Sequence, residues 1–401
     1  MLYLSFSIPI SLSIYLSKKN EKMKKFFFLI GMALFIYSSS FATIRRVGFF
    51  GTPIANVDYY TFATAYTAAA AGDTILMFPN TQLSGTLTKK LTIIGPGSWL
   101  NPANTPKGNA NEQANPDSAT AGSVFLNAGS DGTVIMGFYN GDYFVSANNI
   151  TISRNYNPSV YVAYNQGSST TPINISGLQL QGNYLLYFAN YYTAGTAVTN
   201  LNISNNLINQ FTLSILNTYS GNISNNLWVY DSESPTSTNG GSTTLSTNAG
   251  IDFGNGVFLF QNNIIISYTS ATTSNYDWFP FADDGNTVFN YNLISQSSNS
   301  SNITTNGTGN VILPVANIPS VFTAFPLIGS SSGDARYQLG ASSAALTVGA
   351  GGTAIGMYAG STPYKLSTIP TIPSIYSLSS PQGNNPSGST IQINVSTRGN
   401  N

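Results

Sequence analysis

The chain has 401 residues, of which 42% are hydrophobic and only 7% are charged, and it contains no cysteine and no histidine. This composition excludes disulfide-stapled domains and zinc sites of the cysteine and histidine type, while leaving enough apolar residues for a packed core. From Thr43 onward there are nine Lys or Arg residues against thirteen Asp or Glu residues, a mildly acidic balance that argues against nucleic acid as a partner.

The first 42 residues have the pattern of an export signal. An apolar run at residues 26–37 is followed by the small-residue site Ser40-Phe41-Ala42. Five lysines precede the apolar run: Lys18, Lys19, Lys22, Lys24 and Lys25. About a dozen apolar residues are too few to cross a bilayer, so no membrane insertion of the mature chain is expected. Because residues 2–16 form a second apolar stretch ahead of a complete signal, we take Met23 as the true start. The pattern predicts a secreted or cell-surface protein.

Residues 58–78 change their hydrophobic period halfway. The first part has the spacing of a helix at about residues 59–71, with Asp58 placed to cap its start and Gly72 at its end. A strand at residues 74–78 should follow, and the helix is well placed to cover the first open sheet edge. Downstream, the chain consists of short β-rich runs that end at Gly, Asn or Pro.

The sequence NISNNL occurs at residues 202–207 and again at residues 222–227. Related segments place an asparagine before an apolar doublet, at spacings of 23, 20, 37 and 29 residues: Asn183, Asn206, Asn226, Asn263 and Asn292. The two long spacings contain insertions at residues 231–248 and 267–285, so the underlying period is roughly 20–25 residues. Such a period predicts a solenoid in which each coil stacks on the previous one.

Short strand-like runs without a leucine consensus favour a parallel β-helix over a leucine-rich repeat. Asparagine suits the corner of a coil because it tolerates the left-handed conformation and its amide both donates and accepts hydrogen bonds. Coils stacked at about 4.8 Å would place the five asparagines above one another as a ladder. Chance repetition in an Asn-rich chain is the alternative.

Two segments resemble the right-handed parallel β-helix, or pectin lyase-like, superfamily. Residues 68–97 are similar to its capping helix and first coil, and residues 342–360 are similar to the ending of many secreted β-helix proteins, with Ala344 where proline is usual. The resemblance covers roughly residues 45–360 and implies one all-β domain at residues 43–360. The Pro/Ser/Asn-rich composition of residues 361–401 predicts an extended tail. It is nearest to an uncharacterised surface-exposed group of Gram-negative bacteria and says little about activity.

Lyases of this superfamily use an Arg or Lys base, and its hydrolases use aspartates flanked by histidine. Arg154, with Asp142 nearby in sequence, is a candidate base, although an ordinary surface arginine is the alternative. The candidate paired carboxylates are Asp252, Asp277, Asp283 and Asp284. Because the chain has no histidine, the hydrolase constellation cannot be completed, and the sequence favours a protein without catalysis.

Oxygen-rich loops bind hard cations, and one such loop supplies candidate calcium ligands. These are Asp277, Asp283, Asp284 and Asn286. A solvated Asp-Asp-Gly turn is the alternative, and no other cofactor is expected.

Aromatic residues gather at residues 137–144, 155–165 and 183–192. Alternate residues of a strand face outward, so one of Tyr191 and Tyr192 should reach the surface, and Trp278 is a further candidate. Exposed rings beside amides suit sugars, although these rings can also fill the interior.

We therefore expect an exported, non-catalytic surface or extracellular protein, structural or adhesive, with a polysaccharide or cell-surface glycan as partner. One alternative is a polysaccharide lyase or glycoside hydrolase. The other is a subunit that self-associates into a surface layer or filament, because low charge and flat sides favour association.

Overall fold

The computed structural model divides the chain into two compact units, Met1–Ala42 and Thr43–Asn401. The description concerns the second unit. The residues that the structure describes are 42–49, 57–98, 100, 115, 117–162, 172–184, 186–190, 195–213, 217–231, 251–253, 255–268, 286–295, 306–324, 334–379 and 393–399.

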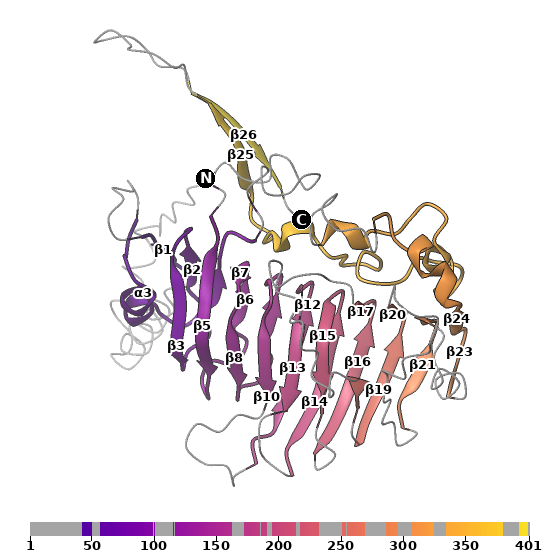
Figure 1. Ribbon diagram of the computed structural model, residues 1–401. Helices are drawn as coiled ribbons and strands as arrows, with labels where there is room; N and C mark the ends of the chain where they lie inside the picture. The colour runs from indigo at the N-terminus through magenta and orange to yellow at the C-terminus, as the bar shows by residue number, and fades with distance from the viewer. Residues whose placement is uncertain are drawn as a thin grey trace, which may run out of the picture. The chain divides into compact units, whose positions relative to one another are not determined.

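The described strands form two long sheets, each of twelve strands paired in parallel (Figure 1). Sheet A contains β1 (Ile44–Val47), β2 (Thr74–Met77), β4 (Thr92–Ile94), β6 (Val134–Met136), β9 (Thr151–Ser153), β11 (Ile175–Ser176), β12 (Gln179–Gln181), β14 (Ala197–Ser204), β16 (Thr218–Ser224), β19 (Asn255–Gln261), β21 (Val288–Asn290) and β23 (Gly307–Thr308). Sheet B contains β3 (Gln82–Leu87), β5 (Ala119–Leu126), β7 (Phe138–Tyr139), β8 (Asp142–Val145), β10 (Ser159–Val162), β13 (Leu186–Asn190), β15 (Leu207–Thr212), β17 (Leu227–Asp231), β18 (Ile251–Asp252), β20 (Ile264–Tyr268), β22 (Leu293–Ser295) and β24 (Val311–Leu313).

From β2 onward the chain alternates between the two sheets, and each strand pairs with the corresponding strand of the next coil. For example, β14 pairs with β16 in sheet A, while β15, which follows β14, pairs with β17 in sheet B. This topology confirms the predicted parallel β-helix solenoid. The inward side chains of both sheets form one continuous core, in which rings such as Phe188 and Phe211 stack between coils.

The turn that joins a sheet A strand to the following sheet B strand is built alike in seven successive coils, and we call it the asparagine corner. One residue has a positive φ, and the next residue is an asparagine, which is buried in the first six coils and partly buried in the seventh. The positive-φ residues are Arg154, Gly182, Asn205, Asn225, Asn262, Tyr291 and Gly309. Asparagine and glycine adopt this conformation at low cost, which explains the Asn-Asn pairs of the sequence repeat.

A helix, α3 (Phe62–Ala68), packs on the first coil and buries Phe62 and Ala65. It is shorter than expected, and Thr61 rather than Asp58 caps its start by accepting a hydrogen bond from the Thr64 N–H. Thr61 caps the helix because its backbone is extended and it lies three residues before the N–H that its hydroxyl accepts from, which is the geometry of an N-cap. Asp58 instead forms an ion pair with Arg46.

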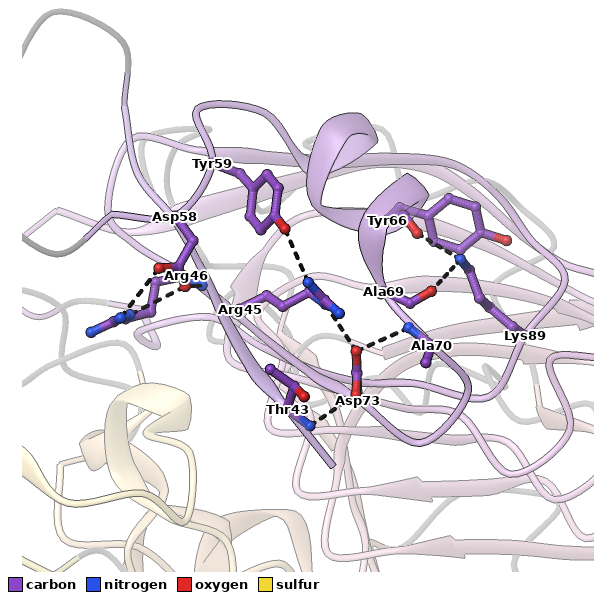
Figure 2. A network of polar contacts seen from close by, with 10 residues as sticks. All are labelled: Thr43, Arg45, Arg46, Asp58, Tyr59, Tyr66, Ala69, Ala70, Asp73 and Lys89. Atoms are coloured by element: carbon purple, nitrogen blue, oxygen red, sulfur yellow. Dashed lines mark hydrogen bonds and ion pairs between the residues drawn. The ribbon is translucent and has the colours of Figure 1, made fainter. Parts of the chain in front are cut away.

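Polar contacts hold α3 and β1 onto the first coil, and we call them the cap network (Figure 2). The Asp73 carboxylate, which is buried, accepts hydrogen bonds from Thr43 N, Ala70 N and Arg45 Nε at 2.8–2.9 Å. Lys89 Nζ donates to the carbonyls of Tyr66 and Ala69 at the end of the helix. Burial alone would raise the pKa of Asp73, but these hydrogen bonds and the Arg45 charge outweigh it, so the pKa is lowered.

Coil strands are described as far as β24, after which residues 334–371, here called the return segment, run back along the asparagine corner (Figure 1). Gly356 N donates to Asn262 O, Asn205 Nδ2 donates to Met357 O, and Arg154 Nη1 donates to Ile369 O. The segment contains the 3-10 helices η3 (Ala335–Tyr337), η4 (Ala344–Leu346) and η5 (Leu366–Thr368). Another, η2 (Val315–Ser320), precedes it, and an antiparallel hairpin follows it, formed by β25 (Ser374–Ser379) and β26 (Asn394–Arg398).

Candidate functional site

The asparagine corner contains a continuous ladder of buried amides. In each coil the asparagine backbone N–H donates to the side-chain oxygen of the next member at 2.8–3.0 Å, and the side-chain nitrogen reaches the same oxygen at 2.9–3.3 Å. The members are Asn155, Asn183, Asn206, Asn226, Asn263, Asn292 and Asn310. All five asparagines predicted from the sequence belong to the ladder.

Each amide nitrogen also donates to a backbone carbonyl of the preceding coil, and in four coils it donates to the carbonyl two residues earlier as well. Asn206 Nδ2, for example, donates to Leu180 O at 2.8 Å and to Ser204 O at 3.0 Å. Because Asn206 is completely buried, these bonds replace water for groups that would otherwise be unsatisfied. The ladder is therefore structural, and it fixes the position of every side chain that follows the corner.

The residue after each of the first six ladder asparagines faces outward and is covered by the return segment, whereas Val311, which follows Asn310, is exposed. The covered residues are Tyr156, Tyr184, Leu207, Leu227, Ile264 and Leu293, and they form a second hydrophobic core with Tyr337, Ile355, Met357 and Tyr364. The next residue of the apolar doublet, such as Ile208 or Trp228, faces inward. The first residue of each apolar doublet therefore packs in the second core, under the return segment, and the second residue packs in the core of the solenoid.

One acidic group lies inside this second core. Asp334 is fully buried, and its carboxylate accepts hydrogen bonds from the Tyr364 hydroxyl at 3.0 Å and from Ser367 N at 2.6 Å. The Tyr358 hydroxyl donates to the Asp334 carbonyl. Burial, together with the nearby Asp334 carboxylate, raises the pKa of Tyr358 and of Tyr364 well above the ordinary value. Both tyrosines are therefore neutral donors that hold the return segment in place.

The outer face of sheet B carries four partly exposed rings on successive strands, which we call the aromatic row. They are Phe125, Phe144, Tyr161 and Tyr187, with neighbouring ring centroids 4.8, 5.0 and 5.6 Å apart. The first three lie in register on β5, β8 and β10, and Tyr187 lies diagonally beside Tyr161. Because Phe125, Phe144 and Tyr161 stack nearly parallel, their edges face outward, whereas the Tyr187 ring is tilted by 54° against Tyr161.

Polar side chains run beside the aromatic row. Ser123, Asp142 and Ser159 occupy the register positions two residues before Phe125, Phe144 and Tyr161. Ser123 is exposed and the other two are partly exposed. The face thus combines an apolar strip with hydroxyl and carboxylate groups, and its rigidity comes from parallel backbone pairing across four coils.

The candidate base Arg154 is at the asparagine corner. It is the positive-φ residue before Asn155, and its guanidinium donates to Ile369 O of the return segment at 2.9 Å. Burial lowers the pKa of Arg154. Asp142, its proposed partner, is on the outer face of sheet B.

Most other predicted site residues lie outside the described part of the chain. This holds for Tyr191, Tyr192, Trp278, Asp277, Asp283 and Asp284. Asn286, the last candidate calcium ligand, is exposed just before β21, and Asp252 lies in β18. Within the described ranges, no three His, Cys, Asp or Glu residues lie together as a metal site would require.

Sequence reasoning missed two ladder members and the aromatic row. Asn155 and Asn310 could have been found, because each is also followed by an apolar residue, Tyr156 or Val311. The aromatic segments named above contain Phe144, Tyr161 and Tyr187, but the alignment of their rings in one row follows from the pairing of strands in successive coils.

None of the helices in the described residues is both long and apolar enough to cross a membrane. Comparisons with protein families, with curated proteins and with solved structures give no match to this chain.

Proposed function

We propose that this chain is an exported, non-catalytic surface or extracellular protein that is structural or adhesive and binds a polysaccharide or cell-surface glycan. The observation that carries the proposal is the aromatic row on the outer face of sheet B. Sugars present apolar C–H faces together with hydroxyls, so they suit a strip in which rings lie beside Ser123, Asp142 and Ser159. Ring edges carry partial positive charge and attract hydroxyl oxygens.

We also propose a family for this chain. We place the chain in the pectin lyase-like superfamily, in its surface-exposed group from Gram-negative bacteria, on the sequence resemblance of residues 68–97 and 342–360. The parallel solenoid supports this placement. Export follows from the signal pattern of the first 42 residues.

The test is a glycan array probed with the purified protein, with and without calcium, followed by product analysis of every glycan that binds. Tyr161→Thr and Phe144→Thr remove rings from the aromatic row while keeping a residue suited to a strand. Val257→Thr is the matched control, because Val257 is exposed on the outer face of sheet A. We expect binding without cleavage, lost in the two row variants and retained in the control.

Two results would contradict the proposal. Cleaved products would show an enzyme and direct attention to Arg154 and Asp283. Absence of binding to any glycan would remove the adhesive function and leave a structural one.

A second function, self-association into a surface layer or filament, is favoured by an aliphatic patch on sheet A. Val257, Leu259 and Val288 are 54%, 38% and 40% exposed, and Leu259 lies in register with Val288. Sedimentation velocity over a range of protein and calcium concentrations tests it. A single monomeric species throughout would contradict assembly, whereas larger species that Val257→Thr weakens would support it.

A further inference from the structure

An open depression of about 710 Å³ lies beside the first coils. It is formed where the chain leaves β1, where β2 turns into β3, and where β5 begins. Its lining residues include Phe49, Asn80, Gln82, Asp117, Ser118 and Thr120.

Backbone pairing fixes the elements that form the depression. Gly48 N donates to Tyr59 O at 2.9 Å and Phe78 N donates to Val47 O at 2.8 Å, which positions the chain on both sides of the β1 exit. Asn80 N donates to Ser118 O at 2.9 Å, and Thr120 N donates to Thr81 O at 3.0 Å. The turn and the start of β5 are thus held together independently of their side chains.

One hydrogen bond and the strand register position the polar side chains of the depression. Asn80 has φ of 62° and donates its side-chain N–H to Asp117 Oδ2 at 2.9 Å. Among the described residues nothing bonds the other Asp117 oxygen, Oδ1. Gln82 and Thr120 lie in register on adjacent strands, and both are exposed. The side-chain amides of Asn80 and Gln82 therefore line one side of the depression, and each offers an oxygen acceptor and an N–H donor.

Phe49 supplies an apolar platform, with half of its side chain exposed. A ring platform beside carboxylate and amide groups recognises a ligand with an apolar face and several hydroxyls. The Asp117 charge repels an anionic ligand, and a single carboxylate among the described lining residues is a poor site for a divalent cation. The chemistry therefore selects a neutral sugar ring.

We propose that this depression is a second glycan subsite that takes a neutral sugar, with Phe49 stacking on the ring and Asp117 accepting its hydroxyls. The inference rests on the proposed glycan-binding function and deepens it by naming the ligand class. Thr120 lies in register with Tyr139 of the next coil, and β5 carries both Thr120 and Phe125 of the aromatic row. A glycan chain bound along β5 would therefore reach both places.

The test is isothermal titration of the purified protein with neutral xylo-, manno- and cello-oligosaccharides and with oligogalacturonate as the anionic comparison. Phe49→Ser and Asp117→Asn remove the platform and the charge, and Asp117→Asn retains an oxygen for Asn80. Thermal melting of each variant verifies folding. We expect a neutral oligosaccharide to bind, with an affinity at least tenfold weaker in either variant.

Tyr161→Thr separates the two proposals. If Tyr161→Thr abolishes binding while Phe49→Ser and Asp117→Asn bind as the unchanged protein does, the subsite is overturned and the aromatic row stands. Binding of oligogalacturonate alone would also overturn the subsite and leave the glycan function intact. If no oligosaccharide binds and the glycan array is silent as well, both proposals fall.

Discussion

The asparagine corner and the cap network both satisfy buried polar groups, but the corner uses neutral amides and the cap network uses charges. The corner repeats one arrangement in seven coils, each amide bonding the next. The cap network occurs once, at the first coil, where the Asp73 carboxylate accepts hydrogen bonds from Thr43, Arg45 and Ala70. The difference shows that a stack of identical coils favours a group that both donates and accepts, whereas an arrangement that is made only once, at the first coil, can use charge because the described coils do not repeat it next to a like charge.

The largest effect is expected for Asn206→Ala. The change leaves the Asn183 N–H and the Leu180 carbonyl without their partner in a fully buried turn, and each unsatisfied group costs about 1–3 kcal/mol. We expect the free energy of unfolding to fall by about 4 kcal/mol in chemical denaturation. Asn202→Ala is the control, because Asn202 is exposed on β14, the strand that leads into the same turn, and its loss should cost under about 0.5 kcal/mol. Equal losses in the two variants would refute the ladder as a stabilising element.

Gly356→Ala should disturb the corner from outside, through the return segment. Gly356 has φ of 86°, and an added Cβ would lie 2.5 Å from Ile264 Cδ1, so we expect a loss of about 2 kcal/mol. Hydrogen exchange should rise in residues 345–371 while the coil strands stay protected. Gly351→Ala is the control, because Gly351 also has a positive φ but nothing lies within 4 Å of its added Cβ. Faster exchange throughout the coils would mean that the return segment is needed for the solenoid itself.

The sequence predicted the solenoid and five ladder asparagines because the repeat is local: a corner, an apolar doublet and a period that appear within each coil. It did not predict where the return segment lies. The Asn205 side chain donates to the carbonyl of Met357, 152 residues away in the sequence, and Arg154 donates to that of Ile369, 215 residues away. No local sequence pattern can predict these contacts. The aromatic row depends on which residues of β5, β8 and β10 lie in register, a pairing between coils that composition does not reveal.

Asp73→Asn should weaken the cap network while leaving the ladder intact. The variant loses the ion pair with Arg45, in which Nε lies 2.9 Å from Asp73 Oδ2 and both side chains are largely buried. Hydrogen bonds to a charged group contribute about 1.5–3 kcal/mol, and because asparagine keeps one acceptor, we expect a loss of about 1.5 kcal/mol. Asp58→Asn is the matched control, since its pair with Arg46 is considerably more exposed and should contribute little. An equal loss in both variants would show that burial does not distinguish the two pairs.

The smallest effect is a difference in pH dependence that separates the two regions. The pKa of Asp73 is lowered in the folded state, so its stabilisation is fully present above the unfolded pKa, near 3.9, and is lost as the pH falls through the lower folded value. The stability gap between the unchanged protein and Asp73→Asn should therefore stay constant from pH 6 to about pH 5 and narrow as the pH falls further toward 3, at no more than about 1.4 kcal/mol per pH unit. The gap for Asn206→Ala should stay constant, because the ladder amides do not titrate. Denaturation midpoints of the three proteins across this range measure both gaps. A ladder gap that also narrowed would show that acid loosens the corner itself, and the contrast between neutral amides and charges would then fail.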